Sequence, residues 1–137
     1  MQTLCLKQGM KHRETLPFLE DSESIICYYP TGSRCICYPP PENTDEDYIV
    51  LVNSIKYVTY PMILSMLGWK ENGKQYKGSD FISFKKDIDG VLTNLIITKY
   101  DDFYQQWIHA TEDAKERNLL NKADRIKLFD DYINYRI

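Results

Sequence analysis

The chain has 137 residues, of which 43% are hydrophobic and 27% are charged, and this length suits one compact domain rather than two independent cores. Its 17 basic and 20 acidic residues give a net charge of −3, so no overall basic field is available to hold nucleic acid, and any such contact must be local. No apolar run approaches the roughly 20 residues that span a bilayer, and the N-terminus lacks the apolar stretch of a signal peptide. We therefore expect a cytoplasmic protein that makes no membrane contact.

The first half of the chain predicts one helix followed by two strands. Residues 1–20 carry apolar side chains at a spacing that fits a short amphipathic N-terminal helix, which would end before Pro17 and cover one face of a sheet. The β-branched and aromatic runs at 25–29 and 48–52 predict buried strands. Between them we expect the segment 34–44 to be irregular, because its three consecutive prolines forbid a helix across its middle.

The next part of the chain predicts a helix and a hairpin. Pro61 lies near the start and Gly68 just past the end of an apolar stretch, and this asymmetry is typical of a helix. Strands are expected at 81–84 and 91–98, and the turn between them would make the two strands a hairpin.

The C-terminal third predicts two further helices. Asp101 can cap a helix that runs through about Arg117, and Asn121 with Asp124 resembles a capping arrangement for a last helix. The elements together predict an α+β fold, with a mixed sheet flanked by helices. We expect a single domain over 1–137, divided into an N-terminal helix (1–20), a core sheet that holds the site (25–98) and C-terminal helices (101–137).

The cysteines do not favour a zinc site. They lack the CxxC pairs that bring two thiolates to one tetrahedral ion, and the two histidines lie far from them in sequence. We interpret them as small buried hydrophobic residues of a protein in a reducing compartment. The residues concerned are Cys5, Cys27, Cys35 and Cys37, with His12 and His109.

The most informative stretch joins a glycine turn to two carboxylates. Gly32 and Ser33 follow the first predicted strand; the glycine permits close backbone approach, and the hydroxyl and amides around Ser33 can donate to phosphate oxygens. Asp45 and Asp47 stand at the start of the second strand, where residues two apart point to the same side and can share a hard divalent cation. These parts predict a site for a nucleotide triphosphate with Mg²⁺ or Mn²⁺.

In this order and spacing the sequence resembles the nucleotidyltransferase superfamily, which includes DNA polymerase β, aminoglycoside nucleotidyltransferases and minimal nucleotidyltransferases. Their shared pattern is a hydrophobic strand, Gly-Ser, about ten residues, then Asp-x-Asp at the head of a second strand. Gly32-Ser33 and Asp45-Glu46-Asp47 match it, and Thr44 stands where a small hydroxyl residue often precedes the first Asp. The resemblance covers about residues 25–98. The chain is also similar to small phage-encoded nucleotidyltransferase-like proteins, through motifs such as Asp124-Arg125-Ile126.

The resemblance implies a transferase that moves a nucleoside monophosphate from the triphosphate to an acceptor hydroxyl of RNA, protein or a small molecule and releases pyrophosphate. It implies that Gly32, Ser33 and Arg34 bind the nucleotide. It also implies that Asp45 and Asp47 are catalytic and hold the metal.

The third acidic position of the family falls on Asn94, which the resemblance therefore places among the catalytic residues. An asparagine can coordinate a cation through its carbonyl oxygen, but it cannot accept the proton of an attacking hydroxyl. Asp87 or Asp89, in the predicted hairpin turn, could supply the carboxylate in another register, although both are typical turn residues. The alternative function is that of a catalytically inactive module with the nucleotidyltransferase fold. In a phage protein, such a module would sequester a nucleotide or bind a host partner.

Other cationic and aromatic residues are weaker candidates for the site. Further cations could bind the triphosphate, but Arg34 is best placed because it directly follows Ser33; the others are Lys85, Lys86, Lys122 and Arg125. Four large aromatic residues fall within strand or helix patterns and are predicted to belong to the core rather than to stack on a base: Tyr28, Tyr29, Trp69 and Trp107.

Overall fold

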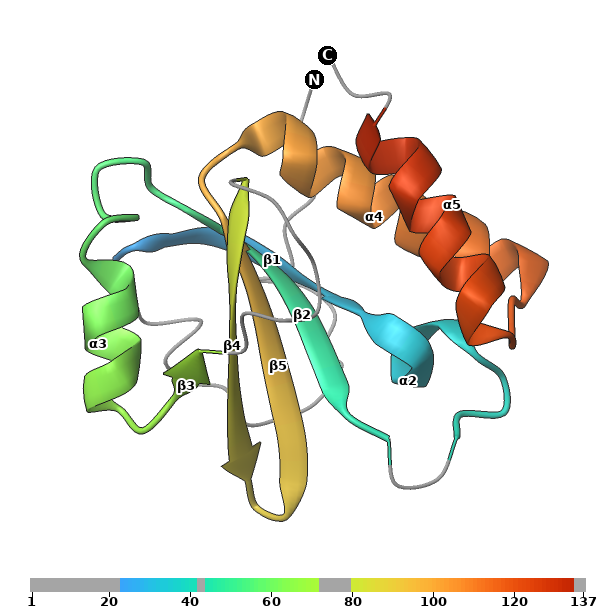
Figure 1. The fold of residues 1–137 in the computed structure, drawn as a ribbon, viewed down its shortest axis with the longest axis horizontal. Helices are drawn as coiled ribbons and strands as arrows, with labels where there is room; N and C mark the ends of the chain where they lie inside the picture. Colours follow the sequence, from blue (N-terminus) through green and yellow to red (C-terminus); the bar gives the residue numbers. More distant parts are fainter. Residues whose placement is uncertain (1–22, 42–43, 72–79, 135–137) are drawn as a thin grey trace.

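The computed structural model describes residues 23–41, 44–71 and 80–134, and these form a mixed sheet with helices on both faces (Figure 1). In the described part, five strands lie in the order β1-β2-β5-β4-β3. The strands are β1 (Ile25–Thr31), β2 (Glu46–Val52), β3 (Lys70–Glu71), β4 (Phe81–Ile88) and β5 (Val91–Thr98). The helices are α2 (Gly32–Ile36), α3 (Tyr60–Met66), α4 (Asp101–Arg117) and α5 (Lys122–Asn134). This architecture confirms the predicted α+β class, while the helix predicted at 1–20 lies outside the described residues.

The centre of the sheet is a parallel pair of strands. Strand β2 runs parallel to β5, whereas β1 pairs with β2 and β4 with β5 in antiparallel fashion. A left-handed Asp89-Gly90 turn closes the predicted β4-β5 hairpin, as a two-residue hairpin loop requires. In the parallel pair, Asp47 lies opposite Asn94. The topology therefore brings together two candidate residues that are far apart in sequence.

Side chains of β2 alternate between two cores. Ile49 and Leu51 pack with Trp107 beneath α4 and α5, whereas Tyr48 and Val50 pack on the opposite face, which α3 covers (Figure 1). Both faces of the strand are apolar, as expected for the centre of a parallel pair. Because odd and even residues serve different layers, Asp47 faces the α4 and α5 side with Ile49.

Several details differ from the sequence-based expectations. Helix α2 occupies the start of the segment 34–44 that we expected to be irregular, and β3 is an additional strand. Both elements are too short for the periodic pattern that reveals a helix or strand in sequence to repeat. Strand β1 extends through Pro30 to Thr31, which an edge strand tolerates. Asp101 is the first residue of α4 and not its cap, which is Tyr100.

The predicted cap of the last helix is confirmed, and the expectations for the cysteines and the large aromatic residues are confirmed in part. The side chain of Asn121 accepts a hydrogen bond from the amide of Ala123 at 2.8 Å and so caps α5. The three cysteines within the described ranges are free thiols: Cys27 and Cys37 are buried, and Cys35 is partly exposed. Trp69 is buried, whereas Tyr28 and Tyr29 are only half-buried. Within the described ranges, no helix combines the length and apolar character needed to cross a membrane.

Candidate active site

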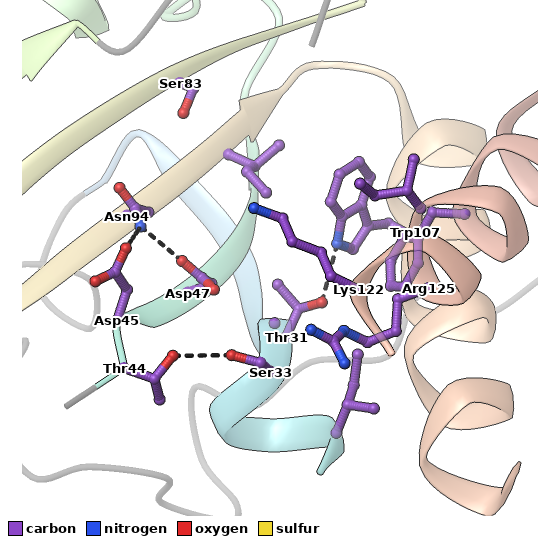
Figure 2. Close-up of a pocket in the computed structure, with 15 residues that line it drawn as sticks. Thr31, Ser33, Thr44, Asp45, Asp47, Ser83, Asn94, Trp107, Lys122 and Arg125 are labelled. Atoms are coloured by element: carbon purple, nitrogen blue, oxygen red, sulfur yellow. Dashed lines mark hydrogen bonds between the residues drawn. The ribbon is translucent and has the colours of Figure 1, made fainter. Parts of the chain in front are cut away.

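Two carboxylates and one amide meet where β2 and β5 begin. Asp47 is the second residue of β2 and lies opposite Asn94 of β5 in the parallel register, and Asp45 immediately precedes β2. The Nδ2 group of Asn94 donates hydrogen bonds to Oδ1 of Asp47 at 2.8 Å and to Oδ2 of Asp45 at 3.1 Å (Figure 2). The structure thus places Asp45, Asp47 and Asn94 together, as the sequence predicts.

The charge state of Asp47 is shifted by its surroundings. Burial raises the pKa of the Asp47 carboxyl to about 6, and the nearby carboxylates of Asp45 and Glu46 add to this, while the hydrogen bond from Asn94 acts in the opposite direction. An ionised Asp47 is therefore costly in the absence of a cation. A divalent cation between Asp45 and Asp47 would remove that cost, which is the electrostatic property expected of a metal-binding carboxylate.

Gly32 lies directly against Asp47. Its φ of +80° falls in the left-handed region, and a Cβ added there would stand 2.7 Å from Cγ of Asp47. A residue with a side chain therefore fits neither the backbone nor the space. The chain needs glycine here because the backbone approaches the carboxylate closely.

Ser33 connects α2 to the segment that leads into β2. Its hydroxyl and the hydroxyl of Thr44 share a hydrogen bond of 2.9 Å, which links the residue after the glycine to the residue before Asp45 (Figure 2). Gly32 and Ser33 are therefore linked through this hydrogen bond to the segment that carries the carboxylates. Both residues line the same pocket as Asp45 and Asp47.

A pocket of about 320 Å³ lies between the sheet and the C-terminal helices. One wall is acidic and comes from β2 and β5, and the other carries Lys122 and Arg125 from α5 (Figure 2). Apolar side chains line the pocket between these walls. The lining residues are Thr31, Gly32, Ser33, Ile36, Thr44, Asp45, Asp47, Ser83, Asn94, Ile96, Trp107, Lys122, Arg125, Ile126 and Phe129.

The cationic wall consists of two differently held side chains. Arg125 donates from Nη1 to the carbonyl oxygen of Leu119 at 2.9 Å and lies 3.4 Å from Sγ of Cys37, so its guanidinium is anchored at the rim. Lys122 is exposed and extends into the pocket, and it forms no hydrogen bond or ion pair with any described residue (Figure 2). Its ammonium group is therefore free to bind an anion.

Arg34 does not line this pocket. Its Nη1 instead pairs with Oε2 of Glu46 at 3.1 Å, and the buried Glu46 also accepts a hydrogen bond from the hydroxyl of Tyr48 at 2.7 Å. Glu46 stands between the two aspartates, and strand alternation turns it to the opposite face of β2. Arg34 thus follows Ser33 in sequence, but its guanidinium lies on the face of β2 opposite to the pocket. There its ion pair with Glu46 holds α2 against the sheet.

The other candidate cations and carboxylates also lie outside the pocket lining. Lys86 donates to the carbonyl oxygen of Leu67 at 2.6 Å, and Lys85 does not line the pocket. In the hairpin turn, Asp87 accepts a hydrogen bond from the amide of Gly90 at 2.9 Å, and Asp89 has a left-handed φ of 54°. Asp87 and Asp89 are thus turn residues and do not supply a third carboxylate to the pocket.

Two cations of α5 and Trp107 line the pocket, although sequence reasoning did not assign them to the site. Lys122 and Arg125 were expected to be weaker candidates than Arg34, and Trp107 was expected to be a core residue; it is buried but also lines the pocket. Its indole Nε1 donates to Oγ1 of Thr31 at 3.0 Å. The available signal was the helical spacing of Lys122, Arg125 and Phe129, which places two cations beside the apolar stripe of α5.

Within the described ranges, no group of three acidic, histidine or cysteine side chains can hold a metal ion. The reason is that the residue beside Asp45 and Asp47 is Asn94, whose side chain is an amide and not a carboxylate. The donors that are present still fit a hard divalent cation, because Asn94 brings an amide oxygen that is buried and has no hydrogen-bond partner among the described residues. Two carboxylates and this oxygen could together ligate Mg²⁺ or Mn²⁺.

The raised pKa of Asp47 predicts that Asp47→Asn stabilises the cation-free protein at neutral pH. The native carboxyl has a higher pKa than the unfolded one, so its contribution to stability falls as pH rises from about 4 through about 6, and asparagine does not ionise. In EDTA, we expect the variant to melt several degrees above wild type at pH 7.5 and close to it at pH 4, below most of the window in which the native carboxyl loses stability. The exposed Asp131→Asn controls for loss of one charge. An equal offset at both pH values would contradict the assignment.

Comparisons with known proteins show a fold likeness and no sequence relative. The crystal structure of the conserved protein GrpB from Enterococcus faecalis superimposes with a TM-score of 0.57, covering 82% of this chain and 83% of that one, at 13% sequence identity. No protein-family model matches the chain, and no curated protein matches it. The similarity to GrpB therefore shows a shared fold.

Proposed function

We propose that this protein is a divalent-cation-dependent nucleotidyltransferase that uses a nucleoside triphosphate. The observation that supports this most is the meeting of Gly32, Ser33, Asp45 and Asp47 in one pocket, across which Lys122 extends. The same four residues carry the resemblance to the nucleotidyltransferase superfamily. The mixed sheet, with β2 and β5 parallel at its centre, supplies a rigid platform for them.

Each residue has a role that its position allows. Asp45 and Asp47 would hold Mg²⁺ or Mn²⁺, which when bound neutralises the triphosphate and lowers the pKa of the acceptor hydroxyl. Ser33 and the backbone at Gly32 lie beside these carboxylates and can donate to phosphate oxygens. Lys122 extends toward the same space and can pair with the outer phosphates.

The proposed reaction is an in-line displacement at the α-phosphorus. The acceptor oxygen forms a bond to that phosphorus, the bond from the α-phosphorus to the oxygen bridging to the β-phosphate breaks, and pyrophosphate leaves. The acceptor proton passes to solvent, since the amide of Asn94 cannot accept it. The acceptor is a hydroxyl of RNA, of a protein or of a small molecule.

One observation favours the inactive binding module instead. Asn94 occupies the place beside Asp47 where the superfamily carries its third carboxylate, and no other carboxylate lines the described pocket. A binding module would retain cation-dependent nucleotide binding without transfer. In a phage protein such a module would sequester a nucleotide or bind a host partner.

An experiment that follows the α- and the γ-phosphate separately distinguishes the transferase from the binding module. Nucleoside triphosphates labelled at the α- or the γ-phosphate are incubated with Mg²⁺, a bacterial cell extract and either wild type or Asn94→Asp. The transferase predicts α-label attached to an acceptor, γ-label released as pyrophosphate, and a faster reaction with the aspartate variant. If neither protein transfers label while both bind nucleotide, the enzyme is excluded and the binding module is supported.

The role of Lys122 predicts a selective loss in affinity for triphosphates. Lys122→Met should weaken binding of a triphosphate by about 10- to 100-fold, the range for a hydrogen bond to a charged group, and should hardly change binding of the monophosphate. Lys127→Met, which removes an exposed lysine of the same helix that does not line the pocket, is the matched control. Calorimetry with both nucleotides measures this. Equal losses for the two nucleotides would assign Lys122 a role other than phosphate binding.

A further inference from the structure

The side-chain amide of Asn94 is buried, and its nitrogen has hydrogen-bond partners among the described residues whereas its oxygen has none. Its side chain lines the pocket and the residue is 6% exposed. Nδ2 donates to both Asp45 and Asp47, whereas Oδ1 has no hydrogen-bond partner among the described residues. A buried oxygen without a partner costs about 1–3 kcal/mol, so this orientation must be favoured by something else.

The two carboxylates explain the orientation. With Oδ1 turned toward them, three oxygens carrying negative charge would face one another, two of them from Asp45 and Asp47. With Nδ2 turned toward them, one amide group satisfies both with charge-assisted hydrogen bonds. The observed orientation is therefore the favourable one when the carboxylates share no cation.

A divalent cation reverses this preference. An ion held between Asp45 and Asp47 repels the N–H groups that now point at those carboxylates and attracts the amide oxygen. The nitrogen and oxygen of the amide are nearly the same size, so a half-turn about the Cβ–Cγ bond exchanges them with little change in packing. No backbone movement is needed.

We propose that Asn94 is a cation-responsive ligand, whose amide holds the two aspartates together in the cation-free site and turns its oxygen to the metal when one binds. The inference rests on the proposed function only in taking Mg²⁺ or Mn²⁺ as the cation. It gives the site three protein oxygens but only two negative charges, which one divalent ion neutralises. Asn94 is thus a ligand and not a remnant of a lost carboxylate.

The test measures Mn²⁺ binding without nucleotide in wild type, Asn94→Leu and Asn94→Asp, by calorimetry and electron paramagnetic resonance. Leucine has the branched shape and the same number of side-chain heavy atoms as asparagine, although its methyl groups are bulkier, and it neither donates nor ligates. We expect Mn²⁺ affinity to fall by at least about tenfold in Asn94→Leu and to rise in Asn94→Asp. If Asn94→Leu binds Mn²⁺ as tightly as wild type, or more tightly, the amide only competes with the cation and the proposal is overturned.

A second measurement detects the ligand directly in the wild-type protein. In wild type labelled with ¹³C at the asparagine side-chain carbonyl, bound Mn²⁺ should show a hyperfine coupling to one carbonyl carbon, which Asn94→Asp identifies by its loss. Bound Mn²⁺ without that coupling overturns the proposal, and so does a wild type that binds no Mn²⁺. The phosphate-label assay decides the proposed transferase separately, because transfer could proceed with Asp45 and Asp47 as the protein's ligands.

Discussion

Replacing both Asp45 and Asp47 with asparagine should abolish Mg²⁺-dependent nucleotide binding. The pair supplies all the negative charge that the described pocket offers to a cation, and losing both ligands should exceed the roughly 10- to 100-fold that loss of a single supporting group costs a metal site. Calorimetric titration of a non-hydrolysable triphosphate, with and without Mg²⁺, measures the effect. We expect the Mg²⁺-dependent part of the affinity to disappear.

The double variant should remain folded, which makes the result interpretable. Asparagine keeps the shape of aspartate, and removing a charge that burial makes costly should not lower the melting temperature in EDTA. Asp130→Asn combined with Asp131→Asn removes the same net charge from the exposed side of α5 and serves as the control. A folded Asp45 and Asp47 double variant that still shows Mg²⁺-dependent binding would exclude this pocket as the nucleotide site.

Gly32→Ala should be more damaging than the same substitution at the other described glycines, Gly68 and Gly90. The left-handed φ costs about 1 kcal/mol for any side chain, and the new Cβ would overlap Asp47, which adds about 1–3 kcal/mol of overpacking. Gly90→Ala is the matched control, because Gly90 has a φ of +85° but open space around its Cα. Urea denaturation of both variants separates the conformational cost from the contact with Asp47.

A second substitution identifies the cause of the Gly32→Ala defect. If the new methyl group collides with the Asp47 carboxylate, adding Asp47→Ala should recover part of the lost stability while nucleotide binding stays lost. The recovery should be incomplete, because the Cβ of residue 47 would still lie 2.9 Å from the new methyl group. Gly32→Ala that destabilises no more than Gly90→Ala would show that the close approach of Gly32 to Asp47 is not required.

The long elements were predictable because each displays its own period or composition. Strands β2 and β5 are apolar runs, and α4 ends at the predicted Arg117 and begins at Asp101, the residue predicted to cap it. Helix α2 spans five residues and β3 two, so neither has a detectable repeat. These elements form where tertiary contacts favour them, as when α2 is held to β2 by the Arg34–Glu46 pair.

Half of the candidate site was predictable for a similar reason. Gly32, Ser33, Asp45 and Asp47 form a local motif whose order and spacing can be read along the chain, and the parallel register brings Asn94 to them. The cationic wall could not be found in this way, because α5 meets the pocket only through the packing of α5 on α4. Adjacency in sequence favoured Arg34, which pairs with Glu46 and does not line the described pocket.

A crystal structure with Mn²⁺ and a non-hydrolysable triphosphate would test the proposed site most directly. Anomalous scattering locates Mn²⁺ without reference to the protein map. The account predicts an anomalous peak ligated by both Asp45 and Asp47, with the triphosphate beside Ser33 and its outer phosphates toward Lys122. A triphosphate bound elsewhere on the protein, or bound here with no Mn²⁺ at the two aspartates, would contradict it.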